Sequence, residues 1–237
     1  MLGAVATVFA IVAGVRSCTN DSSTASSTSA SGLSAGAQRA YSAAGVNSGW
    51  GPDRPTFTTR TPSRTAAFNS ITDNPAFGDE RAFTQCKLSR QPDGAYGDTV
   101  GVSSGDEVSV YVYVSNAASP SVPEETISDA HMSLVLDSDF RDDPGLEVIL
   151  TGTQTTTGRQ LKVWDGCRIT SQEPIRLAFV RGSATVSTAG AADDQPMSDG
   201  VVNNSQPLPS THGLEPGVVP VENAYGYMNF RVIALAQ

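Results

Sequence analysis

The sequence predicts an all-β protein: a single antiparallel β-sandwich, preceded by an export or anchor segment and a disordered linker. Short runs with apolar side chains at every second position, rich in valine and aromatic residues, recur after residue 80. Clusters of Gly, Pro, Ser, Asn and Asp separate these runs, as is typical of turns between short strands. The sequence holds no long amphipathic helix pattern and no glycine-rich phosphate loop.

Residues 1–18 form the predicted export or anchor segment. Their apolar run, residues 2–15, would be roughly 21 Å long as a helix, shorter than a bilayer's hydrocarbon core of about 30 Å. This length is typical of an export signal, although no Lys or Arg precedes the run; a buried core helix is the alternative. Residues 15–18, VRSC, resemble a lipobox, with Arg16 where a small or uncharged residue is expected. Cys18 is therefore a candidate lipidation site, with ordinary secretion or an uncleaved anchor as the alternatives.

Residues 19–49 are the predicted disordered linker. They are mostly Ser, Thr, Ala, Gly and Asn, with almost no large apolar side chains. A segment of this composition cannot bury enough apolar surface to offset the entropy cost of ordering. A long tether after a membrane-proximal cysteine suits a module held away from a cell surface. We therefore expect an extracellular or cell-envelope location.

Residues 50–237 are the predicted β-sandwich domain. Within residues 106–115, four valines alternate with serine and tyrosine, so the expected strand has β-branched side chains on one face and aromatic ones on the other. Similar short runs predict the remaining strands. They lie at residues 131–136, 146–151, 159–171, 174–181, 183–188 and 225–235.

Cys86 and Cys167 are the two cysteines of this domain. Cys86 lies in a further predicted strand, AFTQCKLS (residues 82–89), and Cys167 in the one predicted at residues 159–171. In an oxidising compartment such a pair often forms a disulfide. We therefore predict a Cys86–Cys167 bridge, with two separate buried thiols as the alternative.

Charge is unevenly distributed along the chain. Residues 67–237 carry 22 acidic and 10 basic side chains, a net charge of −12, whereas residues 1–66 carry a net charge of +3. A domain this acidic would repel phosphate backbones, so nucleic-acid binding is not expected. The simpler role of the negative charge is to keep an exported domain soluble.

One acidic loop is a weak candidate for calcium, which binds oxygen ligands. Asp137, Asp139 and Asp143 are spaced loosely like the ligands of such a loop. The glycine and terminal glutamate of an EF-hand are missing, however, and Arg141 lies within the loop. A solvated turn is the alternative, and no other cofactor is predicted.

No catalytic residue is predicted. Residues 101–105, GVSSG, match the formal pattern of a serine nucleophile, but a strand rather than a helix should follow them, which favours a tight turn. A carbohydrate-active enzyme would need two carboxylates about 5–10 Å apart, a distance that sequence does not supply. Trp50 and Trp164 could stack on a sugar, although Trp164 could equally pack within its sheet.

Residues 68–83, FNSITDNPAFGDERAF, are expected to form a rigid corner that leads into the first strand. Asn74-Pro75 favours extended or turn backbone, and Gly78-Asp79 favours a second bend. Polar side chains would hydrogen-bond to backbone amides, the arginine would pair with a carboxylate, and the apolar residues would close the end of the sandwich. A ligand site is the alternative. The residues of this structural signature are Asn69, Asp73, Asn74, Pro75, Gly78, Asp79, Glu80 and Arg81.

The same region carries a family resemblance. The blocks GWGPDRPTFTTRTPS and FNSITDNPAFGDERAF resemble the start of an uncharacterised family of exported bacterial β-sandwich proteins from actinobacteria and candidate-phyla bacteria. The later blocks DEVSVYVYVSNAA, VWDGCRITSQEPIRLAFVRGSATV and GYMNFRVIAL are also similar to that family, so the resemblance spans residues 49–237. It departs at residues 217–224, where a PGC-like turn is expected. The resemblance implies a surface or secreted immunoglobulin-like module without an established activity.

The leading hypothesis is a non-enzymatic module with a binding, structural or adhesion role in the cell envelope or outside the cell. Its expected partner is an unknown surface protein or glycan, and only the N-terminal segment should contact the membrane. The alternatives are an exported carbohydrate-active enzyme and a calcium- or sugar-binding lectin-like domain.

Overall fold

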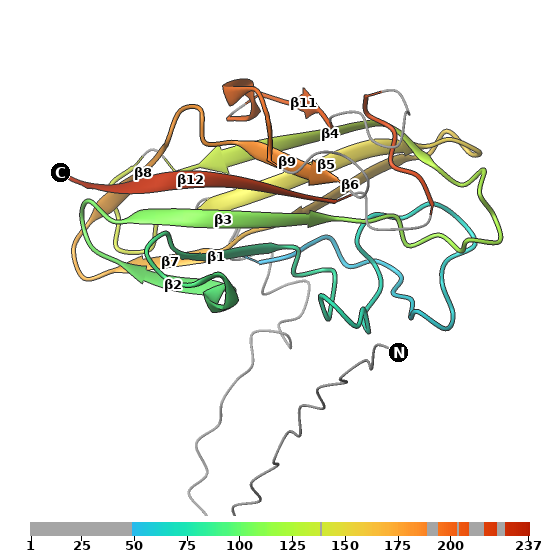
Figure 1. Cartoon of the computed structure of the whole chain (residues 1–237), viewed down its shortest axis with the longest axis horizontal. Coiled ribbons are helices and arrows are strands. Elements are labelled where there is room, and N and C mark those ends of the chain that lie inside the picture. The colour runs from blue at the N-terminus through green and yellow to red at the C-terminus, as the bar shows by residue number, and fades with distance from the viewer. Residues whose placement is uncertain (1–48, 138, 189–193, 203, 209–215, 222–225) are drawn as a thin grey trace, which may run out of the picture. The chain divides into compact units, whose positions relative to one another are not determined.

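The structure is a computed structural model of the chain, and it describes residues 49–137, 139–188, 194–202, 204–208, 216–221 and 226–237. The described residues are all-β, with two large antiparallel sheets, which confirms the predicted class (Figure 1). The strands are β1 (Thr84–Leu88), β2 (Thr99–Val102), β3 (Glu107–Val114), β4 (Ile127–Leu136), β5 (Leu146–Gln154), β6 (Gln160–Asp165), β7 (Arg168–Ser171), β8 (Ile175–Phe179), β9 (Thr185–Thr188), β10 (Gln195–Pro196), β11 (Gln206–Pro207) and β12 (Gly226–Ala236). Two short 3₁₀ helices are η2 (Asp93–Ala95) and η3 (Asp199–Val201).

The larger sheet is built around β3 and β12, which pair antiparallel along the whole of β3. β1 pairs with the other edge of β3, and β8 and β9 share the far edge of β12. Because β12 has 11 residues, its C-terminal half can pair with β8 while its N-terminal half pairs with β9. β10 pairs with β9 at the margin of this sheet.

The second sheet contains β11, β4, β5 and β6 in that order, and all of its pairs are antiparallel. The β4–β5 register shifts between Ser128 and His131, where Asp129 has a positive φ of 49°. In Figure 1 this sheet passes behind β3 and β12, so the two sheets form two layers. β6 lies at the edge of the second sheet.

One hydrophobic core lies between the layers because both sheets present apolar side chains at alternate positions. In β3 the four valines are buried, and the intervening side chains are partly exposed. Burying a side chain of this size stabilises a fold by about 1.5–3 kcal/mol. The largest fully buried side chains are Phe68, Phe83, Phe230, Ile127, Met132, Leu134, Leu146, Leu150, Ile169, Ile175 and Leu208.

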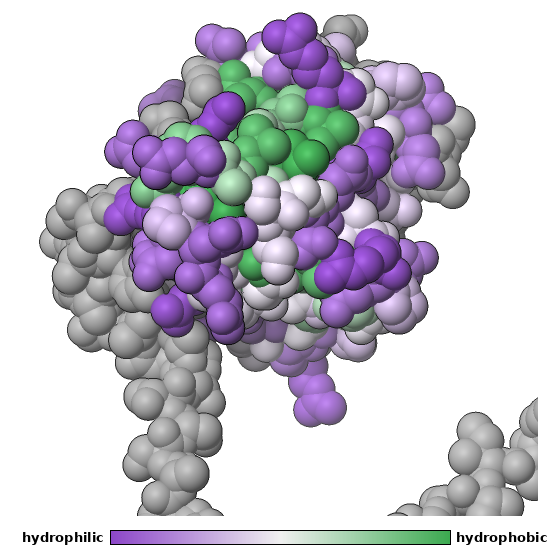
Figure 2. Space-filling view, turned by 90° about the vertical axis from the view of Figure 1, so that its left-hand side faces the viewer, coloured by the Kyte–Doolittle hydropathy of each residue, from purple (hydrophilic) through white to green (hydrophobic). Residues whose placement is uncertain are grey.

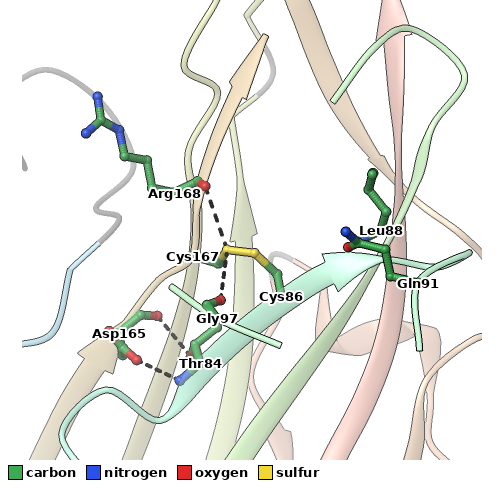
Figure 3. The surroundings of a disulfide bond; sticks show 8 residues. All are labelled: Thr84, Cys86, Leu88, Gln91, Gly97, Asp165, Cys167 and Arg168. Atoms are coloured by element: carbon green, nitrogen blue, oxygen red, sulfur yellow. Dashed lines mark hydrogen bonds between the residues drawn. A yellow bond between two sulfur atoms is a disulfide. The ribbon is translucent and has the colours of Figure 1, made fainter. Parts of the chain in front are cut away.

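The strand pair β2–β7 differs from the expected antiparallel arrangement because it is parallel. The single strand predicted at residues 159–171 is in fact two strands, interrupted at Gly166 and Cys167. β6 stays in the second sheet, whereas β7 leaves it to pair with β2. Cys167 forms the predicted disulfide with Cys86 of β1, with the Cα atoms 6.0 Å apart (Figure 3). The disulfide therefore ties the start of β7 to the larger sheet.

The predicted export segment with Cys18, and all of the linker except Gly49, lie outside the described residues. Within the part of the chain that is described, no helix is long and apolar enough to cross a membrane.

Candidate functional site

Residues 50–83, the lead-in segment, run along the sheets before β1 begins (blue to teal in Figure 1). They form no strand of their own and are held by hydrogen bonds and single-residue bridges. One of these hydrogen bonds joins two parts of the segment: the Thr59 amide donates to Asp73 Oδ1 at 2.6 Å. The bridges are Gly51–Trp164, Phe57–Ile71, Ser63–Ala118, Phe68–Asn116 and Asn74–Gly78.

Asn69 fastens the signature corner (residues 68–83) to the end of β3. Its φ is 42°, in the left-handed region that asparagine tolerates, and its side chain is buried. Asn69 Nδ2 donates to the Tyr113 carbonyl at 2.9 Å, and Oδ1 accepts the Ser115 amide at 3.2 Å. The Asn69 side chain therefore supplies the hydrogen bonds that a neighbouring strand would otherwise make to the Tyr113 carbonyl and the Ser115 amide.

Glu80 is buried in the corner and is only 2% exposed. Its carboxylate accepts hydrogen bonds from the Ser115 hydroxyl at 2.6 Å, Asn74 Nδ2 at 2.7 Å and the Ile71 amide at 3.3 Å. Removing the carboxylate would leave these buried donors without their partner, at a cost in stability. Glu80 therefore holds the corner together.

Asp79 and Arg81 form a bidentate ion pair beside Glu80. Arg81 Nε lies 2.9 Å from Asp79 Oδ1, and Nη2 lies 2.5 Å from Oδ2. The same guanidinium lies over the Trp50 ring, 4.3 Å from its centroid. Hydrogen bonding to Asp79 raises the pKa of Arg81. Burial acts to raise the pKa of Asp79, but the hydrogen bonds from Arg81 lower it overall.

Asn74 and Gly78 close the turn of the corner. Their backbones exchange two hydrogen bonds, of 3.0 and 2.7 Å. Asn74 Oδ1 accepts two further amides after Pro75, including that of Phe77 at 3.1 Å. Gly78 has a φ of 87°, which glycine adopts without steric cost. The hydrogen bonds of the Asn74 side chain and the positive φ of Gly78 therefore determine the turn.

Phe77 lies on the outer face of the larger sheet, although it was expected to close the end of the sandwich. Its ring stacks on Tyr113, with centroids 4.5 Å apart, and lies 6.2 Å from Tyr111. Tyr111 stacks in turn on Tyr227 at 5.1 Å, and Tyr96 tilts against it. Burial raises the pKa of both Tyr111 and Tyr113 to about 12. The other apolar residues of the corner, Phe68, Ile71 and Phe83, are buried.

Arg54 of the lead-in segment is half-buried, and Asp165 at the end of β6 is buried. Arg54 donates to the Asn69 carbonyl at 2.9 Å and to the Ser70 hydroxyl at 3.2 Å. Burial lowers the pKa of Arg54 to about 10, against the opposing charge of Asp165. Asp165 is 3% exposed and accepts the Thr84 amide at 2.6 Å (Figure 3), and burial raises its pKa well above the usual range. Both side chains therefore serve structural hydrogen bonds.

A groove of about 370 Å³ opens where the lead-in segment leaves β6. One wall comes from lead-in residues between Pro52 and Ser70, and the other from residues 160–163 of β6. Apolar side chains such as Phe57 and Leu161 line it together with polar ones. The charged lining residues are Asp53, Arg54, Arg159 and Lys162.

The backbone of β6 faces this groove with an open edge. Gly51 pairs with Trp164 through two backbone hydrogen bonds, of 2.8 and 2.9 Å, on the side of β6 opposite to β5. Because backbone directions repeat at every second residue, the amides and carbonyls of Lys162 and Gln160 point to the same side. Among the described residues, no backbone group bonds to them on that side.

Trp164 is covered by the lead-in segment. Gly51 packs on the indole so closely that a Cβ atom at position 51 would overlap the ring. The indole Nε1 is buried, with no hydrogen-bond partner in the described part of the chain. Trp164 is half-buried and packs its indole against Gly51, which leaves less of the ring for stacking on a sugar.

The acidic loop between β4 and β5 (residues 137–145) has an arginine among its aspartates. Arg141 Nη1 lies 2.9 Å from Asp137 Oδ2, and Arg141 Nε lies 3.4 Å from Asp143 Oδ1, while Asp139 is exposed. Over the described ranges, no group of three or more His, Cys, Asp or Glu side chains could hold a metal ion. The arrangement favours ion pairing, and calcium at this loop stays a prediction.

Residues 101–105 comprise the last two residues of β2 and a tight turn that leads into β3. The Ser103 amide donates to Asp106 Oδ2 at 2.9 Å, and the Asp106 amide donates to the Ser103 carbonyl at 3.0 Å. Gly105 has a φ of 86°. The setting is that of a tight turn into a strand, without the helix that a nucleophile elbow needs.

An apolar patch surrounded by hydrophilic residues lies on the end of the domain that is on the left of Figure 1, and Figure 2 shows it face on. Phe140, in the acidic loop, is exposed to 38%. The guanidinium of Arg176 lies 5.7 Å from its ring centroid and covers part of the ring.

Comparisons with known proteins assign this chain to no family. A scan against protein-family models finds no match. Searches among curated proteins and among solved structures find no match either. The choice of a function therefore rests on the geometry of the corner and the groove.

Sequence reasoning did not single out the groove residues. Arg159 and Lys162 fall within the one long strand predicted there, and only the pairing of β6 places them at a sheet edge. A weak signal was present, because two basic residues stand close together in an otherwise acidic domain.

Proposed function

We propose that the chain is a non-enzymatic binding module with an immunoglobulin-like fold, exported and held in the cell envelope or released outside the cell. The groove beside β6 supports this proposal, because it is an open surface next to a strand edge at which no described residue pairs with Lys162 or Gln160. The buried carboxylates of Glu80 in the corner and Asp165 in β6 accept structural hydrogen bonds. They are therefore poor candidates for acid–base chemistry.

The proposed location follows from the cysteines and the N-terminal sequence. A Cys86–Cys167 disulfide is consistent with an oxidising compartment. The apolar run at residues 2–15 supports export, and Cys18 is the proposed lipid attachment point. A radioactive fatty acid should label the chain through Cys18, and a Cys18→Ala variant that stays in the membrane fraction would count against lipid attachment.

Sugar binding is a second candidate, favoured by the row of tyrosines on the outer face of the larger sheet. Flat aromatic faces bind sugars by stacking. Here Phe77 covers the Tyr113 ring, and Tyr111 and Tyr227 cover each other, so mainly ring edges and hydroxyls remain for a ligand. The groove is therefore the stronger site.

Site-specific photo-crosslinking tests the binding role. The full-length chain, exported by a bacterium, would carry a photoreactive residue in place of Lys162 in the groove. Adducts with envelope material are expected at this position and not at Arg181, which is exposed on the turn after β8. No adduct at position 162, or equal adducts at both positions, would refute the proposal. Release of sugar fragments from cell-wall polysaccharide by the purified chain would favour the enzyme alternative.

A further inference from the structure

We infer that the groove beside β6 binds an extended acidic polypeptide, which adds to the edge of β6 as a further strand. This inference rests on the proposed binding function and names the class of its partner. It is carried by three features of the groove: the free strand edge, the alternation of side chains along β6, and the local charge.

The edge of β6 already shows how an added strand would bind. Gly51 pairs with Trp164 by two backbone hydrogen bonds, and the lead-in segment then leaves the edge. Lys162 and Gln160 continue the same row of amides and carbonyls toward the groove. Alternate residues of a strand are about 6.6–6.8 Å apart, which is the repeat of an extended polypeptide backbone. A glycan has no amide donors at this regular spacing, so the edge favours a peptide.

The side chains of β6 specify the pattern of the partner. A peptide residue opposite Lys162 would bond to it through the backbone and place its own side chain beside the lysine. The next peptide residue would lie opposite Leu161, which packs against the core. Since Phe57 of the lead-in segment also lines this groove, an apolar side chain is favoured there. The expected partner sequence therefore alternates apolar and acidic residues.

The charge of the groove favours acidic side chains on the partner. Arg54, Arg159 and Lys162 line it against one acidic residue, Asp53, whereas residues 67–237 as a whole carry a net charge of −12. Arg159 and Lys162 are exposed. Within the described residues, neither has an ion-pair partner. A basic groove in an acidic domain would attract a segment of opposite charge.

Binding of synthetic peptides to the full-length chain tests the inference. The probe is a fluorescein-labelled eight-residue peptide that alternates valine and glutamate, measured by fluorescence anisotropy. It should bind at least tenfold more tightly than the same peptide with lysine in place of glutamate. A version methylated on the glutamate amide nitrogens should also bind at least tenfold more weakly, because it lacks the donors that face β6.

Variants of Lys162 separate the strand edge from the charge. Lys162→Pro removes the amide donor that faces the groove and should weaken binding at least tenfold. The fold should survive, because proline is tolerated where an edge-strand amide points away from the sheet. Lys162→Glu tests the charge without touching the backbone and should also weaken binding, whereas Arg181→Glu, a matched charge reversal outside the groove, should not.

Three outcomes would overturn the inference. Equal binding of the methylated and unmethylated peptides would show that no strand is added, and equal binding of the glutamate and lysine peptides would remove the charge argument. Binding of soluble polygalacturonate without binding of any peptide would make the ligand an anionic glycan. In that last case crosslinking at position 162 would still succeed, so the proposed function would stand and only the partner class would fall.

Discussion

The signature corner (residues 68–83) and the acidic loop (residues 137–145) look alike as sequences but differ as structures. Both combine aspartates, an arginine, a proline and a glycine. In the corner, Glu80 is 2% exposed and accepts three hydrogen bonds from buried or half-buried groups. In the loop, Arg141 is 31% exposed and pairs with Asp137 and Asp143, whose side chains are 14% and 52% exposed.

The difference between the two regions shows that burial, more than composition, decides what a polar cluster does. A buried donor or acceptor that loses its partner costs about 1–3 kcal/mol. An exposed ion pair is screened by water and salt and contributes at most about 1 kcal/mol. We therefore expect substitutions in the corner to change stability and substitutions in the loop to change it little.

Glu80→Ala should have the largest effect. Because the carboxylate serves three donors, we expect the free energy of unfolding to fall by about 3 kcal/mol or more. Urea denaturation of the full-length chain measures the change. The matched control is Asp139→Ala in the exposed loop, for which we expect a change within about 0.5 kcal/mol. Equal stability of the two variants would remove the distinction between the regions.

Asn69→Ala should come next, with a loss of about 2 kcal/mol, because the variant loses two hydrogen bonds and alanine tolerates a positive φ less well than asparagine does. Asn69→Gly also loses both hydrogen bonds but adopts the same backbone conformation freely. Its unfolding free energy should therefore lie between those of wild type and Asn69→Ala. If the glycine variant is no more stable than the alanine variant, the positive φ at position 69 does not contribute to the difference in unfolding free energy.

Asp165→Asn should stabilise the protein at neutral pH. The pKa of Asp165 is raised in the folded protein above the ordinary value of about 3.9. Above pH 4 the unfolded chain releases this proton while the folded protein holds it, so stability falls as pH rises toward the folded pKa. The asparagine can still accept the Thr84 amide. Melting temperatures should therefore favour the variant at pH 7 and converge toward pH 4, and a more stable wild type at pH 7 would contradict this account.

Arg141→Ala in the acidic loop should have a smaller effect than the corner substitutions, about 1 kcal/mol in unfolding free energy, because its ion pairs with Asp137 and Asp143 are partly exposed. Melting curves of the wild type recorded with calcium chloride and with a chelator should coincide. A rise in melting temperature with calcium that Asp139→Ala abolishes would instead establish the weakly predicted calcium site.

The sequence predicted the features that depend on local chemistry. The alternation in β3 has a period of two residues and is visible in any short window, and the turn at Asn74 and Gly78 uses residues whose backbone preferences are known. The disulfide needed only two cysteines and an assumed compartment.

The remaining features depend on contacts between distant residues. Glu80 binds Ser115, which lies 35 positions away, and nothing in the local sequence reveals that partner. The split of β6 from β7 and the parallel β2–β7 pair follow from strand pairing, which a periodic pattern does not encode. Phe77 was expected to close the sandwich, because the sequence alone does not show that tyrosines on the outer face of β3 offer it a stacking surface.

The most direct test measures the affinity of the valine–glutamate peptide for two variants, Glu80→Gln in the corner and Lys162→Pro in the groove. Both would be measured at a temperature where each variant is folded. If the corner is structural and the groove binds the partner, Glu80→Gln should melt at a lower temperature but keep a Kd within twofold of wild type, while Lys162→Pro should bind at least tenfold more weakly. Loss of peptide binding by Glu80→Gln with an unchanged melting temperature, together with normal binding by Lys162→Pro, would contradict the account.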